Sequence, residues 1–108
     1  MMNQIQKACM EACNACYVSC LQCAAACLKE ADVKSMVNCV ALDLECAEVC
    51  RLSVSSMARE GACMKQICEL CAAICDMCAA ECAKHMHAHC KECAEACKRC
   101  TEACRAMV

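Results

Sequence analysis

The sequence predicts an all-α fold, an antiparallel up-down four-helix bundle whose core is lined by cysteine. Twenty of the 108 residues are cysteine, and most recur at alternating spacings of three and four residues, which is the period of one helix face. The chain also has no proline, one glycine and neither phenylalanine nor tryptophan, so sheets and turn-rich folds lack their usual residues. The remaining possibility is a bundle of helices whose cysteine side chains face one another.

The first helix is expected over residues 3–29, where cysteine occupies the face that normally carries leucine in a bundle. This stripe comprises Cys9, Cys13, Cys16, Cys20, Cys23 and Cys27. Its mean repeat of about 3.5 residues is slightly below the period of a straight helix, which favours gentle left-handed winding of neighbouring helices.

Three further helices are expected over residues 32–58, 62–84 and 87–106, each with a stripe of the same kind. The second carries a sparse set, Cys39, Cys46 and Cys50; the third carries Cys68, Cys71, Cys75, Cys78 and Cys82; and the fourth carries Cys90, Cys93, Cys97, Cys100 and Cys104. We expect one domain over residues 1–108, because the chain is long enough for one core and too short for two.

Turn residues locate the connections between these helices. Asp32 suits the N-cap of the second helix, so the first turn is placed near residues 30–32. Gly61 follows the second helix and is a candidate C-terminal cap. The third turn falls within residues 84–88, where neither glycine nor proline marks it.

Connections this short make neighbouring helices antiparallel, so residues of one layer have numbers with a nearly constant sum. Across the first turn Cys16 is expected to meet Cys46, and across the third Cys71 is expected to meet Cys100. The cysteines therefore form stacked layers of up to four thiols.

The second helix departs from this design at its middle core position, where Leu42 and Asp43 compete. A carboxylate inside the bundle is costly unless it is paired. We favour Leu42 inside and Asp43 on a solvated flank.

A second, apolar stripe runs beside the cysteines on the first three helices. It comprises Tyr17, Leu21, Ala24 and Leu28; Val33, Val37, Val40 and Leu44; and Ile67, Leu70, Ile74 and Met77. Two interpretations are open: these side chains fill the grooves between adjacent helices, which we favour, or they form an oligomer interface. The fourth helix lacks the stripe and is expected to be the most solvated.

Charge and hydropathy argue against two classes of partner. The formal net charge is −2 and the basic residues are scattered among acidic ones, so there is no electrostatic footprint for nucleic acid. Charges interrupt every apolar run before the roughly 18 residues of a membrane span. The N-terminal segment enters the first cysteine stripe without a twin-arginine motif or apolar leader, which predicts a cytoplasmic protein.

In the cytoplasm, dense cysteines indicate metal binding or catalysis before disulfides, because thiols are kept reduced there. Helical neighbours also hold their Cβ atoms about 5–6 Å apart, beyond the roughly 3.5–4.5 Å of a disulfide. Cysteine used only as a small apolar residue does not explain twenty of them, since alanine, valine or leucine would pack without the oxidation liability. Metal ligation is the better explanation.

Charge balance separates the metals that soft thiolates select, namely Cu(I), zinc and iron–sulfur clusters. One Cu(I) per thiolate leaves the core neutral, whereas four thiolates around each zinc ion bury two negative charges per site. Iron–sulfur sites wrap a cluster with loops, whereas these cysteines stand on regular helix. The pattern favours multiple Cu(I) ions, up to about one per cysteine.

The repeated motifs CMEACNACYVSCLQCAAAC and CELCAAICDMCAAEC resemble those of the bacterial copper storage proteins, over essentially the whole chain. The resemblance implies a four-helix bundle that fills its core with Cu(I), forms a homotetramer, buffers or stores copper, and has no enzymatic turnover. Exported members carry a twin-arginine signal, so this chain is similar to the cytosolic branch. Copper donor or acceptor proteins are then candidate partners.

Histidine and methionine are expected to gather at one end of the bundle. His85, His87 and His89 surround Met86 at the third turn, and the up-down layout puts Met36 at the same end. Imidazole and thioether can pass a soft ion to thiolates, so this end is the candidate copper entrance; the alternative is a set of merely polar turn residues. His85 continues the cysteine seam of the third helix and is the leading histidine ligand.

The opposite end holds Met57 and Met64, which are expected to cap the core rather than to transport ions. Cys63 breaks the spacing and is expected to be peripheral, although it belongs with the other cysteines in the set of candidate ligands.

Two other functions fit parts of the sequence. A zinc or general thiolate metal buffer would use the same cysteines, and metal competition distinguishes it. A thiol redox protein would use Cys90 and Cys93 near the start of the fourth helix, its thiolate favoured by the helix dipole and by His87 or His89. The redox hypothesis leaves the other cysteines unexplained.

Overall fold

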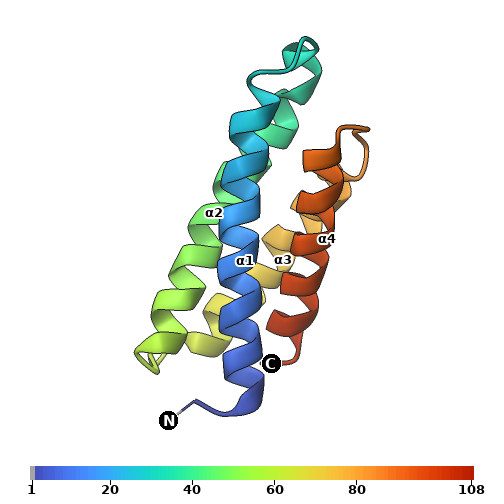
Figure 1. Ribbon diagram of the computed structural model, residues 1–108. Helices are drawn as coiled ribbons and strands as arrows, with labels where there is room; N and C mark the ends of the chain where they lie inside the picture. The colour runs from blue at the N-terminus through green and yellow to red at the C-terminus, as the bar shows by residue number, and fades with distance from the viewer. Residues whose placement is uncertain (1) are drawn as a thin grey trace.

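The computed structural model describes residues 2–108 and consists of four α-helices joined by short turns (Figure 1). Helix α1 spans Gln4–Cys27, α2 spans Val37–Ala58, α3 spans Met64–Cys82 and α4 spans Ala88–Arg105, and a 3-10 turn, η1 at Val33–Met36, precedes α2. Each helix packs against the next, and α4 packs against α1. The all-α, antiparallel up-down four-helix bundle predicted from the cysteine spacing is confirmed.

The bundle is a narrow rod of 47 × 17 × 17 Å. Both chain ends lie at one end of the rod, and the α1–α2 connection projects beyond the α3–α4 turn at the other end (Figure 1). Within the described residues, no helix is both long and apolar enough to cross a bilayer.

The start of α1 is fixed by a capping box. The Asn3 side chain accepts the Gln6 backbone N–H at 2.8 Å, and the Gln6 side chain accepts the Asn3 backbone N–H at 3.0 Å, so two backbone donors at the helix start are satisfied. The predicted cap at Asp32 is wrong, because α2 begins only after η1 and the Asp32 side chain makes no capping bond. Its carboxylate lies instead 3.0 Å from His87 Nε2.

The end of α2 is a Schellman motif. The backbone N–H of Gly61 donates to the carbonyl of Ser56 at 2.8 Å, and that of Glu60 donates to the carbonyl of Met57 at 3.1 Å. Glu60, not Gly61, holds the left-handed position, with φ of 51°. Glycine at position 61 instead avoids a steric clash, since a Cβ there would lie 2.9 Å from Ser56 Oγ. The predicted glycine cap is therefore displaced by one residue.

The core is a continuous interior of sulfur. Every cysteine except the exposed Cys63 is buried, and Met36 and Met57 are fully buried with them. Asp43 is fully buried in the same interior, whereas Leu42 is only half-buried at its edge. The expectation that Leu42 takes the core position and Asp43 a solvated flank is wrong.

The apolar stripe of α1 to α3 does not generally fill grooves. Leu28 and Val37 are each 62% exposed, Leu70 is 52% exposed and Met77 is 59% exposed. Only part of the stripe, including Tyr17, Val40 and Ile74, packs against the core. The favoured groove-filling interpretation is therefore wrong for most of the larger side chains, which form an apolar surface.

Candidate metal centre

The buried cysteine Sγ atoms form a column along the bundle axis. Sulfurs of facing helices lie as close as 3.3 Å, between Cys46 and Cys75, and sulfurs four residues apart on one helix lie 3.7–4.0 Å apart. The predicted layer contacts are present, with Cys16 and Cys46 at 3.8 Å and Cys71 and Cys100 at 3.9 Å. All twenty cysteines are free thiols, so the core offers ligands and not cross-links.

Within the column, sulfurs gather in overlapping groups of four whose members all lie within 4.8 Å of one another. These include Cys13, Cys71, Cys100 and Cys104; Cys16, Cys46, Cys50 and Cys75; Cys16, Cys20, Cys46 and Cys97; Cys20, Cys78, Cys93 and Cys97; and Cys23, Cys27, Cys39 and Cys90. A metal–sulfur bond of about 2.3 Å places the sulfurs of a trigonal site about 4 Å apart. Because neighbouring groups share members, one sulfur can bridge two ions.

Asp43 interrupts this column with a carboxyl group. The thiols of Cys78 and Cys93 each donate to Oδ1 at 3.3 Å, that of Cys82 donates to Oδ1 at 3.4 Å, and that of Cys39 approaches Oδ2 at 3.8 Å. Burial raises the pKa of Asp43 to about 8, because desolvation disfavours the charged form. The pairing with thiols from α2, α3 and α4 is the physical reason that Asp43 can lie inside.

Hydrogen bonds from Cys104 and Cys23 lower the pKa of Cys9 to about 4 and that of Cys39 to about 2, but burial has the opposite effect on other thiols near the two ends of the column. It raises the pKa of Cys27 to about 11 and that of Cys68 to about 12, and it raises the pKa of Cys90 as well. Inside the column, the pKa of Cys20 is raised chiefly by its hydrogen bond with Cys16, because a thiol that donates to sulfur keeps its proton. A metal ion that binds the thiols with a raised pKa must therefore displace their protons.

His89 is the histidine that faces the thiols. Its Nδ1 lies 3.5 Å from the Sγ atoms of both Cys23 and Cys90, and 3.8 Å from that of Cys27. The prediction that His85 leads is not matched by its contacts, since its Nε2 lies 2.9 Å from a carboxylate oxygen of Glu81. Helix α3 ends at Cys82, so the seam that pointed to His85 does not continue to it.

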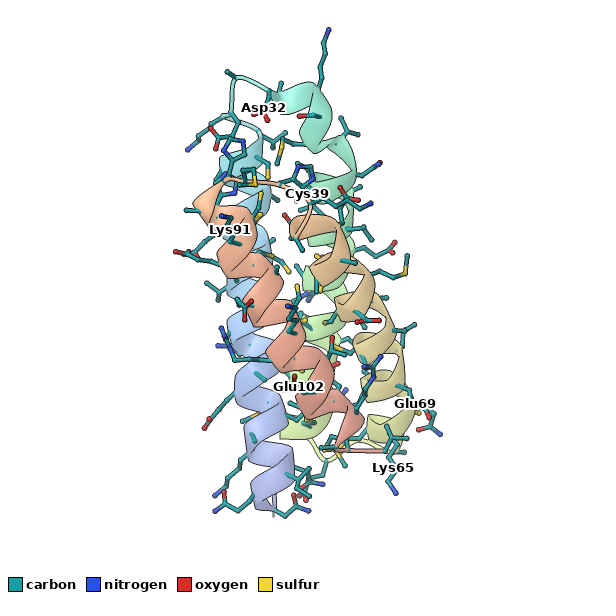
Figure 2. The ribbon with its side chains drawn as sticks, turned by 90° about the vertical axis from the view of Figure 1, so that its right-hand side faces the viewer. Asp32, Cys39, Lys65, Glu69, Lys91 and Glu102 are labelled. Atoms are coloured by element: carbon teal, nitrogen blue, oxygen red, sulfur yellow. The ribbon has the colours of Figure 1, made fainter. Side chains whose placement is uncertain are left out.

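His87 stacks on His89, with ring centroids 5.3 Å apart and planes 5° from parallel. Its Nδ1 lies 3.0 Å from Glu30 and its Nε2 lies 3.0 Å from Asp32, and the bond with His87 lowers the pKa of Asp32. Figure 2 shows Asp32 and Cys39 at this end of the rod, with Lys65 at the other. At the histidine end Met36 is buried, whereas Met86 is 80% exposed.

The remaining predicted residues are divided between surface and core. Cys63 is exposed immediately before α3 and does not join the buried cysteines. At that end Met57 is fully buried and Met64 packs against the core. Cys90 and Cys93 are both fully buried, which denies a redox pair the access to a partner disulfide that exchange requires.

Comparison with known proteins shows which family has this cysteine-rich sequence. The family model described as copper storage protein matches residues 2–108. The chain belongs to the copper storage protein family. The family therefore covers the whole described structure, the histidine end included.

Individual relatives are similar over different lengths. The uncharacterized cysteine-rich protein YhjQ of Bacillus subtilis (strain 168) is 46% identical over 71 residues, which cover 66% of this chain and 66% of that protein. The Cu(I)-bound copper storage protein BsCsp3 is 46% identical in sequence. Its structure matches with a TM-score of 0.92 over 96% of this chain and 98% of that one. A cytosolic copper storage protein from Streptomyces lividans, loaded with five coppers, is 35% identical, with a TM-score of 0.93 over 96% of this chain and 92% of that one.

Proposed function

We propose that this chain stores Cu(I) in the cytoplasm, holding the ions on its buried cysteine thiolates. The observation that carries the proposal is the column of nineteen buried thiols, in which adjacent four-sulfur groups share sulfurs. A relative loaded with Cu(I) has the same fold at 46% identity, and a second one is described as cytosolic. Storage needs many equivalent ligands, and that is what the column provides.

Charge balance in the interior favours Cu(I) over zinc. Among the described residues no lysine or arginine is buried, and the only buried acidic side chains are Asp43 and Glu81. Nothing in this core offsets the two negative charges that each four-thiolate zinc site would leave. One Cu(I) per thiolate leaves the core neutral, so filling can continue along the column.

The histidine end is the proposed copper entrance. His89 Nδ1 faces three thiols there while its side chain remains 22% exposed, so an ion can meet imidazole and sulfur before it is fully enclosed. His85, His87, Met36 and Met86 share this end, and their direct part in binding stays a prediction.

We propose that the chain stores copper without catalysing a reaction and that it does so as an oligomer. The fully buried thiols of Cys90 and Cys93 favour ligation over turnover. The exposed apolar stripe of α1 to α3 supports association of several copies, for which we propose the homotetramer implied by the family resemblance. Copper donor or acceptor proteins would then exchange ions at the end of the rod that the histidines occupy.

An anaerobic Cu(I) titration of the reduced protein against a chromophoric chelator tests the proposal. We expect saturation near one copper per buried cysteine, about nineteen per chain. Cys63→Ser should leave this capacity unchanged, whereas Cys75→Ser should lower it. Saturation at a few ions, with tighter binding of about five zinc ions, would replace copper storage with a zinc buffer.

A further inference from the structure

We infer that Glu30 is a positioning residue, which orients His89 so that its Nδ1 meets incoming Cu(I). The inference rests on the proposed copper storage function. It assigns a role to a carboxylate of the α1–α2 connection, a segment that carries no cysteine after Cys27.

The contact between the two residues joins the two connections at the histidine end. Glu30 Oε2 lies 2.9 Å from His89 Nε2 and 3.0 Å from His87 Nδ1. Glu30 follows α1, whereas His87 and His89 come from the turn before α4 and from its first residues. One carboxylate oxygen therefore contacts two stacked imidazoles, that of His87 before α4 and that of His89 in its first turn.

Holding His89 Nε2 decides which nitrogen is free. A neutral imidazole that donates its Nε2–H to a carboxylate keeps its lone pair on Nδ1, and Nδ1 is the atom 3.5 Å from the Sγ atoms of Cys23 and Cys90. Carboxylates that accept the second ring N–H of a ligating histidine fix its tautomer and orientation and raise its basicity.

His87 limits the freedom of the His89 ring. Both of its nitrogens face carboxylate oxygens at 3.0 Å, Nδ1 that of Glu30 and Nε2 that of Asp32. Its ring covers one face of His89 at a centroid distance of 5.3 Å. Asp32, His87 and Glu30 thus form a brace around the single imidazole that faces sulfur.

The transfer step that this geometry assists is a ligand exchange. Cu(I) leaves the nitrogen ligands of a donor chelate and binds His89 Nδ1 together with the sulfur of Cys23 or Cys90, whose thiol proton is released to solvent. The copper stays Cu(I), and the donor ligands depart unchanged. Glu30 touches neither the ion nor the departing ligand in this step.

The same end of the rod offers a matched control in Glu81. Glu81 Oε2 lies 2.9 Å from His85 Nε2, so it makes the same kind of carboxylate–imidazole contact at the same distance. None of the sulfur contacts made by histidine in the described residues involves His85. Glu81 Oε1 also pairs with Lys84 Nζ at 3.3 Å. Removing Glu81 therefore removes this pair, a similar charge and a similar hydrogen bond, without disturbing an imidazole that faces thiols.

The test is stopped-flow transfer of one Cu(I) per chain from its anionic bicinchoninate complex under anaerobic conditions. We expect Glu30→Ala to slow transfer about 10–100-fold, while Glu81→Ala transfers at the wild-type rate. Loss of negative charge alone would speed the approach of an anionic chelate, so slowing has the opposite sign to a simple charge effect. In a His89→Ala background, Glu30→Ala should add no further slowing.

Long-range ¹⁵N–¹H NMR of the apoprotein gives a second readout. We expect His89 to carry its proton on Nε2 in the wild type and to populate both tautomers in Glu30→Ala, with helical circular dichroism unchanged. Wild-type transfer rates in Glu30→Ala, equal slowing by Glu81→Ala, or additive slowing with His89→Ala would each overturn the inference. A wild-type chain that saturates at a few copper ions would instead defeat the proposed storage function, so the two failures are distinguishable.

Discussion

The thiol of Cys93 donates to Asp43 Oδ1 at 3.3 Å, across the middle of a core that is otherwise sulfur. The same oxygen accepts the thiols of Cys78 and Cys82. Three donors on one oxygen partly offset the cost of enclosing a carboxyl group, but desolvation dominates and raises the pKa of Asp43 to about 8. The apoprotein at neutral pH therefore holds a largely protonated carboxyl group in its core.

Protonation of Asp43 links the stability of the apoprotein to pH. Between the usual aspartate pKa and about 8, the folded state holds a proton that the unfolded state has lost. The free energy of unfolding should therefore be highest at the acid end of this window and fall by about 1.4 kcal/mol per pH unit as pH rises through it. Urea unfolding of reduced apoprotein at several pH values measures the slope.

Asp43→Asn is the matched control for that slope. The amide keeps the shape and an oxygen acceptor but does not titrate, so the decline between the unfolded and folded pKa values should disappear. An unchanged slope in Asp43→Asn would show that another group carries the linkage.

Copper affinity should rise with pH because the core thiols whose pKa is raised begin protonated. The pKa of Cys27 is raised to about 11 and that of Cys68 to about 12, so copper binding to either thiol releases one proton throughout the neutral range. We expect the logarithm of the Cu(I) association constant to increase by about one per pH unit for each proton displaced. Chelator competition across about pH 6 to 8 measures this increase, and an affinity independent of pH would mean that the thiols are already ionised.

The left-handed conformation of Glu60 identifies a stabilising substitution. A residue other than glycine with φ of 51° is strained, by about 1 kcal/mol or more, while glycine loses more backbone entropy on folding. We expect Glu60→Gly to raise the free energy of unfolding by about 0.5 kcal/mol, measured by thermal or urea unfolding of the apoprotein.

The neighbouring Arg59 provides the control for Glu60→Gly. Arg59 is the C-cap of the same helix and has ordinary right-handed helical angles, so Arg59→Gly relieves no strain. It brings the entropic cost of glycine and removes the hydrogen bond from Arg59 Nε to Ser55 Oγ, so it should destabilise the protein. If both glycine variants were destabilised equally, the left-handed φ of Glu60 would not be a source of strain.

The cysteine period predicted the bundle because it is repeated on all four helices and depends on no single contact. Layer contacts such as Cys16 with Cys46 followed from short antiparallel connections. The position of Asp43 did not, because the rule that buried acids are costly depends on partners, and its partners Cys78 and Cys93 belong to other helices. The seam itself, with Asp43 in line between Cys39 and Cys46, was the available signal.

Contacts at the histidine end were also not predictable from the local sequence. Extending the seam of α3 favoured His85, but the helix ends at Cys82 and the direction of later side chains is set by the turn. His89 reaches the thiols from the first turn of α4, and its partner Glu30 lies 59 residues away in sequence. No local pattern joins these two residues, so only the fold brings them together.

The exposed apolar stripe of α1 to α3 predicts that copies of this chain associate with one another. Val37 and Leu44 of α2 are 62% and 48% exposed, so replacing both with glutamate should cost the isolated chain little stability while placing unpaired charge in any interface they form. We expect the wild type to sediment as a homo-oligomer and Val37→Glu/Leu44→Glu to sediment as a smaller species with unchanged helical circular dichroism. Lys98→Glu on α4, which lacks the stripe and whose side chain is 61% exposed, is the control and should sediment like the wild type. A wild type that sediments as a monomer, or a double variant that keeps its assembly, would show that this surface is not the contact between copies.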